Sequence, residues 1–279
     1  MTYIDPNEFI YTMVSIFMSI SEIALKKQNN ATRIVKGIDN SAGHESDQLS
    51  RICVVSQVDK DIQEFLLERI FHNWPFTSVL VEENTPSKFK FRHGQRYYIL
   101  LDPIDGTKNY LSGNNKFCHI ASLMDKTEMI ASIIYSHSHK SIFSAVARKG
   151  AYVTTSDSNS NLVRFADIKR KAFLYHISRT PVELIADLKH IGYNLVPSSQ
   201  NATDIINMIN HNIAGFISMN PIIYDTWSPA MIISETGGWL SDWHGNRLIF
   251  NKKKRIPHLI VTHDANVAKN VLNVLKKYL

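Results

Sequence analysis

The stretch LDPIDGT, residues 101–107, closes an apolar run, YYIL, with two aspartates three positions apart. The run is typical of a buried β-strand, so Asp102 and Asp105 are expected at its C-terminal edge. Pro103 fixes the backbone between them, and Gly106 permits the unusual dihedral angles of a turn. Because carboxylates this close repel each other unless a cation lies between them, the stretch predicts a divalent metal held by oxygen ligands. A capped surface turn is the alternative, since Asp and Gly are common turn residues.

Further acidic positions favour the metal site. Glu82 and Glu83 end another strand-like run, VLVEEN, and Asp225 lies at the start of a helical pattern that ends at Gly237 and Gly238. Carboxylates would thus come from three separate strand or helix ends. In layered α/β proteins, ligands gather at the carboxyl ends of strands in this way.

The composition bounds the class of protein. A chain of 279 residues with 44% hydrophobic and 20% charged residues is ordinary for a globular protein of one large or two modest domains. The net charge of +6 is scattered, and its densest run, NKKKR at 251–255, is short, so an anionic small substrate explains the charge as well as nucleic acid does. Cys53 and Cys118 have no pair spacing, which excludes a disulfide framework or a cysteine metal site and favours a reducing cytosol.

The apolar segment FIYTMVSIFMSISEIAL, residues 9–25, raises a membrane or secretion interpretation. Acidic residues precede it where a signal peptide has positive charge, and it contains Glu22. We therefore expect a helix that packs on the core, no targeting segment and a cytoplasmic location.

The remaining periodicities predict a mixed α/β (α+β) protein. A helix is expected at 58–74, with Asp59 near its start as a candidate cap, and strands are expected in four later runs. Those runs are 77–84, 96–102, 118–125 and 129–137. A polar loop begins near Ser156, after which strand and helix patterns alternate. We expect an N-terminal region, 1–160, carrying Glu82 and the DPIDGT motif, and a C-terminal region, 161–279, carrying Asp225.

The motifs DPIDGT, the preceding EE pair and the block YDTWSPAMIISETGGWLSDWHGN, residues 224–246, resemble those of the inositol monophosphatase family. This family lies within the magnesium-dependent, lithium-sensitive phosphatase superfamily that also contains fructose bisphosphatase. The resemblance extends over nearly the whole chain. It implies a layered αβαβα sandwich, Mg²⁺ as cofactor and a homodimer.

The resemblance also implies roles for individual residues. The metal ligands would be Glu82, Asp102, the backbone carbonyl of Ile104, Asp105 and Asp225. Gly106 and Thr107 would offer backbone amides to the phosphate at the start of a short helix. Asp59 would orient the Thr107 hydroxyl, which would position and deprotonate the attacking water. Thr107, Asp59 and Glu82 are therefore the expected catalytic residues.

The chemistry implied is that of a metal-dependent phosphomonoesterase. Phosphate monoesters hydrolyse very slowly unaided, because the anionic phosphoryl group repels a nucleophile. Magnesium would neutralise that charge, activate the water and stabilise the leaving oxygen. No motif for a covalent enzyme intermediate is present.

Departures from the family pattern concern the substrate. Val81 replaces a glycine before the acidic pair, and Lys108 is more typical of the histidinol-phosphate and nucleotide branches. Ser218 stands where inositol phosphatases have a glutamate against the substrate hydroxyls, which weakens the prediction of inositol specificity. The expected substrate-binding residues are Gly106, Thr107, Lys108, Asn201, Ser218 and Trp227.

The nominal substrate is an inositol monophosphate. The enzymatic alternatives are a histidinol-phosphate phosphatase and a 3'(2'),5'-bisphosphate nucleotidase, and the non-enzymatic alternative is a regulatory binding protein that retains the fold. The pair His137 and His139 is expected on one face of a strand, but without a third ligand a structural role is favoured over zinc binding.

Overall fold

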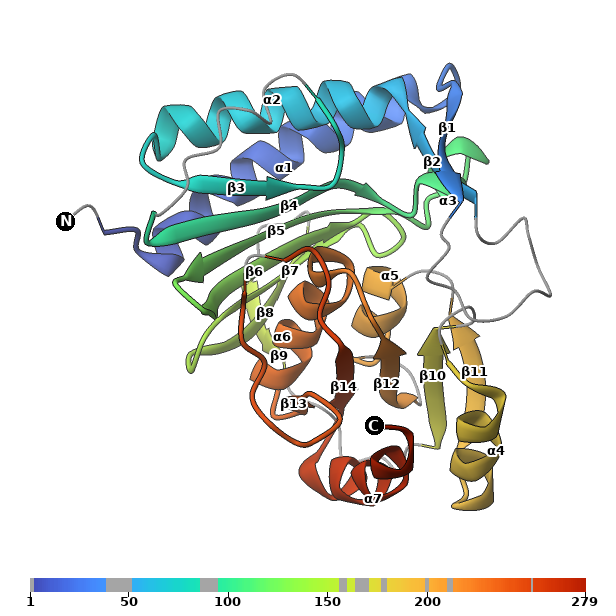
Figure 1. Ribbon diagram of the computed structural model, residues 1–279. Helices are drawn as coiled ribbons and strands as arrows, with labels where there is room; N and C mark the ends of the chain where they lie inside the picture. Colours follow the sequence, from blue (N-terminus) through green and yellow to red (C-terminus); the bar gives the residue numbers. More distant parts are fainter. Residues whose placement is uncertain are drawn as a thin grey trace.

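Five layers make up the protein in the computed structural model (Figure 1), which describes residues 3–38, 52–85, 95–155, 160–163, 171–176, 180–198, 201–209, 213–251 and 253–279. Two helices cover one face of a seven-stranded sheet, two more lie between this sheet and a five-stranded sheet, and two cover the far face of the smaller sheet. This order confirms the predicted αβαβα sandwich.

The seven-stranded sheet runs in the spatial order β3-β4-β5-β6-β7-β8-β9. Its strands are β3 (Ser78–Val81), β4 (Tyr97–Asp105), β5 (Cys118–Asp125), β6 (Glu128–Ser136), β7 (Ser141–Val146), β8 (Gly150–Thr154) and β9 (Ser160–Val163). Only β3 and β4 pair in parallel, and the other neighbours are antiparallel. All nine residues of β4 are buried, with alternate side chains entering the cores on the two faces of the sheet.

The five-stranded sheet has the order β11-β10-β12-β14-β13. Its strands are β10 (Ala172–His176), β11 (Asn194–Ser198), β12 (Ile213–Met219), β13 (Trp239–Ser241) and β14 (His258–Thr262). The pairs of β10 are parallel, and those of β14 are antiparallel. A separate antiparallel pair consists of β1 (Arg33–Ile38) and β2 (Ile52–Ser56).

The helices complete the layers. They are α1 (Pro6–Gln28), α2 (Gln57–Asn73), α3 (Thr107–Leu111), α4 (Val182–His190), α5 (Asn201–Ile206), α6 (Ser228–Glu235) and α7 (Ala265–Leu275). A π-helical turn, η2 (Ile223–Trp227), leads into α6, and a 3-10 turn, η3 (Lys276–Tyr278), follows α7. The strands and helices expected from the sequence are all present, with ends that differ by a few residues.

Helix α1 is long and apolar enough, by length and composition alone, to cross a membrane. In the fold it packs on the seven-stranded sheet, and Phe9, Phe17 and Ile20 have no accessible surface. The prediction of a helix that packs on the core is therefore confirmed. The C-terminal end of α1 also holds α3, because the Gln28 amide donates to the carbonyl oxygens of Tyr110 and Asn114 at 3.0 Å each.

Helix α2 begins with a capping box. Ser56 is the N-cap residue and accepts from the Asp59 amide, while the Asp59 carboxylate accepts from the Ser56 amide. The prediction that Asp59 caps this helix is wrong in its detail, because Asp59 lies three positions inside. Its carboxylate is thereby turned back towards the start of the helix.

The two sheets share one hydrophobic core through α5 and α6. Within it, the buried hydroxyls of Ser122 on β5, Ser132 on β6 and Ser228 on α6 form a cluster. Ser122 Oγ lies 2.8 Å from Ser228 Oγ, and the Ser132 hydroxyl donates to the Ser228 carbonyl at 2.9 Å. This cluster fixes α6 against the larger sheet.

The division into regions 1–160 and 161–279 stays a prediction.

Candidate metal centre

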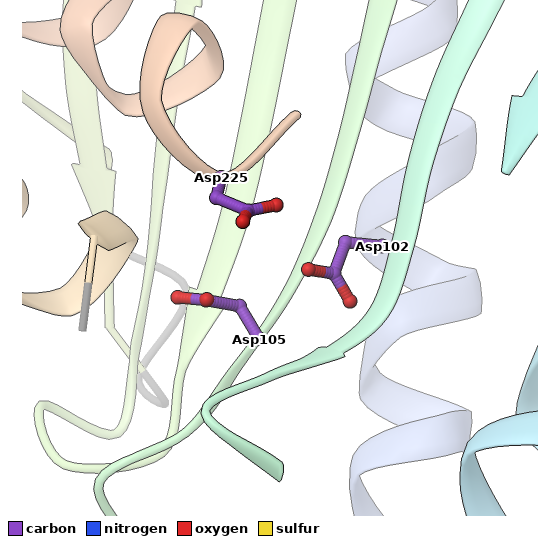
Figure 2. A group of neighbouring side chains, drawn as sticks. All are labelled: Asp102, Asp105 and Asp225. Carbon is purple, nitrogen blue, oxygen red and sulfur yellow. The ribbon is translucent and has the colours of Figure 1, made fainter. Parts of the chain in front are cut away.

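Three aspartates meet where the layers join (Figure 2). Asp102 and Asp105 lie at the end of β4, and Asp225 comes from η2 on the facing layer. One carboxylate oxygen from each residue lies within 4.8 Å of the others. The sequence predicted that these three residues converge, and the structure brings them together from elements far apart in the chain.

A bulge in β4 turns both aspartates towards this point. The register pairs Asp102 with Ile120 and Asp105 with Cys118, so two residues of β4 face one residue of β5. The Ile104 amide donates to Oδ1 of Asp102 at 3.0 Å and fixes that carboxylate.

Gly106 makes the turn out of the bulge possible. It has φ of 90°, in the left-handed region that favours glycine. A Cβ atom there would lie 2.8 Å from the Lys116 carbonyl oxygen, which also excludes a larger residue. The next residue, Thr107, then begins α3.

Asp105 is held by donors from two other elements. Its Oδ2 accepts from the Ala202 amide of α5 at 3.2 Å and from the Cys118 thiol at 3.5 Å. Burial, with a contribution from the charges of Glu82 and Asp204, raises the pKa of Asp105 to about 7 against the lowering effect of these donors. Cys118 is a free, buried cysteine.

Asp102 carries the strongest electrostatic conflict. Burial raises its pKa well above the ordinary value, and the neighbouring charges of Glu82, Asp225 and Asp105 add to the effect. Carboxylate oxygens in such a group match the ligand preference of a hard divalent cation such as Mg²⁺, and a cation would remove the repulsion. The residues present therefore fit the predicted metal.

Glu82 and Glu83 follow β3, beside the end of β4. Glu82 is half-buried, and its amide donates to the Leu101 carbonyl at 3.2 Å. Its charge raises the pKa of Asp102, although it is not one of the three residues that meet within 4.8 Å. Glu83 is buried, and Gln63 of α2 fixes its backbone, because the Gln63 side chain bonds both the amide and the carbonyl of Glu83.

Thr107 and Asp59 are in contact. The Thr107 hydroxyl lies 3.1 Å from Oδ1 of Asp59 and 3.1 Å from the Ile104 carbonyl oxygen. The other oxygen of Asp59 accepts from both the amide and the hydroxyl of Ser56. Burial raises the pKa of Asp59 to about 6, against the lowering effect of the hydrogen bonds from Ser56. The capping box thus leaves one oxygen of Asp59 for Thr107.

Comparisons with known proteins show the family of this chain. The sequence profile described as the inositol monophosphatase family matches residues 17–275. The chain belongs to this family. It is 21% identical over 223 residues to the 3'(2'),5'-bisphosphate nucleotidase CysQ of Haemophilus influenzae, covering 75% of this chain and 80% of the relative. It is 22% identical over 271 residues to the Nus factor SuhB of the same organism, covering 93% and 95%.

A solved structure supports the fold. An IMPase/NADP phosphatase complexed with Mg²⁺ and phosphate superposes with a TM-score of 0.75 at 17% identity, covering 96% of this chain and 95% of that chain. Membership of the inositol monophosphatase family, together with the acidic cluster, makes this chain a metal-dependent phosphatase.

The residues expected to line the family's substrate pocket are dispersed. Ser218 lies on β12 without accessible surface, so it is not exposed to a substrate in this conformation. Trp227 is almost fully buried and lines a cavity of about 450 Å³ together with Met231 and Trp239. That cavity is lined by none of the site carboxylates.

Two other expected substrate residues lie nearer the metal centre. Lys108 is exposed on α3, directly after Thr107. Asn201 is the first residue of α5, and its side chain lies outside the described residues. Val81, which departs from the family's glycine, is buried at the end of β3.

The histidines are arranged differently from the prediction. Strand β6 ends at Ser136, so His137 and His139 both lie in the turn that follows rather than on one face of a strand. His139 contacts the Ser136 hydroxyl through Nδ1 at 2.8 Å, whereas His137 contacts His119. Sequence reasoning missed His119, because a single histidine within an apolar strand carries no recognisable motif. It also missed Cys118 and Ala202 as partners of Asp105.

Proposed function

We propose that this protein hydrolyses a small phosphate monoester in a magnesium-dependent reaction that uses water as the nucleophile. The observation that carries the proposal is the convergence of Asp102, Asp105 and Asp225, whose carboxylate oxygens lie within 4.8 Å of one another. Buried carboxylates with raised pKa values at such a point are costly unless they bind a cation.

The metal would be held by carboxylates and one carbonyl. The proposed ligands are Glu82, Asp102, the Ile104 carbonyl, Asp105 and Asp225. When bound, Mg²⁺ supplies positive charge that offsets the charge of the phosphoryl group and increases the acidity of water. The hydrogen bonds from the Ile104 amide to Asp102 and from the Ala202 amide to Asp105 support this assignment, since they orient the carboxylates in advance.

Thr107 and Asp59 would position the water. When Asp59 is ionised, it accepts a hydrogen bond from the Thr107 hydroxyl. The lone pairs of Thr107 Oγ1 can then accept a hydrogen bond from water. Ser56 saturates the second oxygen of Asp59 and so prevents the carboxylate from rotating. We propose that the amides of Gly106 and Thr107 contact the phosphate, with Glu82 acting on the water from the β3 side.

Inositol monophosphate is the nominal substrate, and a nucleotide bisphosphate is the second candidate. A polar cavity of about 400 Å³ favours the second candidate, because a larger leaving group needs such room. Asn109, Lys116, His139 and Thr203 are among the residues that line it. Asp204 also lines it, and the charge of Asp204 raises the pKa of Asp105, so the cavity lies within electrostatic range of the acidic cluster, although none of the site carboxylates lines it.

The test is a phosphate-release assay. Inositol 1-phosphate, histidinol phosphate and 3'-phosphoadenosine 5'-phosphate are compared with Mg²⁺, with EDTA, and with Mg²⁺ plus Li⁺. We expect release that requires Mg²⁺ and is inhibited by Li⁺. If no substrate releases phosphate although the protein binds Mg²⁺, the regulatory binding protein becomes the better assignment.

The choice between substrates can be tested at Lys116. Lys116→Ala removes an exposed positive charge from the polar cavity. We expect kcat/KM for the nucleotide bisphosphate to fall by about tenfold, or about 1.4 kcal/mol, with little change for inositol phosphate. Lys189→Ala, which removes an exposed lysine from α4, is the matched control. Equal effects on both substrates would remove the cavity from the substrate site.

We also propose a cytoplasmic homodimer, because the family resemblance implies one. Light scattering of the purified protein measures the oligomeric state, and fractionation of cells measures the location. A monomer at micromolar concentration would contradict the proposed homodimer.

A further inference from the structure

The peptide between Pro103 and Ile104 is held from both of its sides. Its N–H group, on Ile104, donates to Oδ1 of Asp102 at 3.0 Å. Its carbonyl group, on Pro103, contacts Nδ1 of His119. His119 is the single β5 residue opposite the bulge in β4, so an imidazole faces the point where the ladder is interrupted. The orientation of this peptide therefore depends on Asp102 on one side and on His119 on the other.

A second imidazole fixes the first. Nε2 of His137 lies 3.0 Å from Nε2 of His119. Both side chains are buried, His119 without accessible surface. Burial lowers the pKa of His119 to about 4 and, together with the nearby His119, that of His137 to about 2, so both rings are neutral near pH 7.

The direction of these hydrogen bonds follows from chemistry. A carbonyl oxygen only accepts, so Nδ1 of His119 must carry the proton. In a neutral ring, Nε2 of His119 is then an acceptor, and Nε2 of His137 must donate to it. The chain of donors runs from His137 through His119 to the Pro103 carbonyl, and each tautomer is determined by its neighbour.

Aromatic packing immobilises the pair. The ring of Phe117 stacks on His137 with centroids 3.9 Å apart and an interplanar angle of 24°. Tyr135 lies edge-on to His137 at 4.8 Å, and Phe17 of α1 is 6.0 Å from His119. His137 also lines a cavity of about 320 Å³, together with Val14 and Met18 of α1. The ring contacts restrict the orientation of both imidazoles.

We propose that His119 and His137 form a positioning pair that holds the Pro103–Ile104 peptide, and through it the metal-binding carboxylate of Asp102. The inference deepens the proposed function and rests on it. Neither histidine is among the proposed metal ligands. The pair keeps the Ile104 amide directed at Asp102, so that the carboxylate is oriented before Mg²⁺ binds.

Loss of the His119 donor would leave the Pro103 carbonyl buried without this hydrogen bond. The peptide could then rotate to find another partner, and the Ile104 amide would leave Asp102. The expected defect is weaker metal binding, with a smaller effect on turnover at saturating Mg²⁺. A merely structural role predicts a lower melting temperature with an unchanged Mg²⁺ requirement.

The test compares a variant that lacks the hydrogen-bond donor at position 119 with a variant that restores it. His119→Phe keeps a flat ring and removes the donor, whereas in His119→Asn the amide Nδ2 can replace Nδ1. We expect His119→Phe to raise the Kd for Mg²⁺, measured by calorimetry without substrate, by about tenfold, the lower end of effects on groups that support metal ligands. His119→Asn should restore most of the affinity. His137→Phe should have a weaker effect, which His137→Gln should reverse because its amide Nε2 can donate.

His190→Phe is the matched control, because His190 is an exposed histidine at the end of α4. Its Kd for Mg²⁺ should equal that of the wild type. Nitrogen-15 NMR of the wild type should show the Nδ1–H tautomer for His119 and the Nε2–H tautomer for His137. Wild-type affinity in His119→Phe, or an Nε2–H tautomer for His119, would overturn the positioning pair. Absence of phosphatase activity in a wild type that binds Mg²⁺ would instead contradict the proposed function.

Discussion

Two buried polar clusters flank the Pro103–Ile104 peptide, and they differ in whether the protein itself balances their charges and hydrogen bonds. The acidic cluster of Asp102, Asp105 and Asp225 collects like charges, and burial raises the pKa values of the two carboxylates on β4. The pair of His119 and His137 is neutral, and hydrogen bonds within the protein involve Nδ1 and Nε2 of His119 and Nε2 of His137. The acidic cluster is costly without a cation, whereas the histidine pair carries no charge that needs one.

The two clusters illustrate the different requirements of a group that binds a cation and a group that positions a ligand of that cation. A site for a cation must keep negative charges close together in the empty protein, because the same charges attract the ion, and this attraction outweighs their mutual repulsion. A supporting group acts best when it is fully hydrogen-bonded and packed, since any freedom would be transmitted to the ligand that it orients. The two clusters are expected to respond differently to mutation, metal and pH.

The largest expected effect comes from removing one charge of the acidic cluster. In Asp102→Asn the side-chain oxygen can still accept from the Ile104 amide, so the fold should remain. We expect phosphatase activity to fall by roughly 10⁴ or more, because the lost charge stabilises the metal that the reaction needs. Steady-state kinetics and circular dichroism measure the two properties. A folded variant with normal activity would remove Asp102 from the metal site.

The next effect concerns proton positioning beside the cluster. Thr107→Ala removes the hydroxyl that contacts Asp59 and should lower kcat by roughly 10² to 10⁴ without unfolding the protein. Asp59→Asn should cause a related loss. The double variant should be no worse than the poorer single variant, because the two residues act on the same water. Multiplying losses would show that they act independently.

A smaller effect is expected on stability without metal. Burial raises the pKa of Asp105 to about 7, so the folded state binds more protons than the unfolded state from about pH 4 to pH 7. The contribution of this group to the free energy of unfolding therefore falls as pH rises through that window. In EDTA at pH 8, Asp105→Asn should raise the melting temperature by roughly 2–4 °C, equivalent to about 1 kcal/mol.

The same variant provides its own controls by calorimetry. The rise in melting temperature of Asp105→Asn over the wild type should be smaller at pH 5, where Asp105 of the wild type is mostly protonated. With millimolar Mg²⁺ the order should reverse, because the wild type is stabilised by a ligand that the variant binds weakly. A gain that is independent of pH would mean that charge is not its cause.

Much of the fold follows from the sequence because its signals are local. The run YYILLD marks β4, and the period of apolar residues marks α2 within one residue of its observed ends. Other strands carry no such signal. In β7, SIFSAV, serines and apolar residues are all buried, so polarity does not distinguish its faces. The π-helical turn that carries Asp225 depends on packing between the two sheets and has no sequence pattern.

In the candidate site, too, features with local sequence motifs could be predicted, and features that depend on tertiary packing could not. Asp102, Asp105 and Asp225 belong to recognisable motifs, and their convergence could be predicted. Their partners could not, because the Ala202 amide reaches Asp105 across 97 positions of sequence. Ser218 is expected from the sequence to contact the substrate, whereas in the structure it has no accessible surface, so its role stays a prediction. His119 gave no signal, as its role comes from a bulge in the neighbouring strand.

The hydroxyl cluster of Ser122, Ser132 and Ser228 has a consequence for the order of folding. It joins residues 106 and 96 positions apart, and the same docking of α6 brings Asp225 to Asp102. Contacts so distant in sequence close late, because the entropy of a long loop must be overcome first. We therefore expect the repulsion among the carboxylates to arise mainly after the folding barrier has been crossed. Bound cations should then act chiefly by slowing unfolding, which lengthens the lifetime of the folded protein more than it speeds folding.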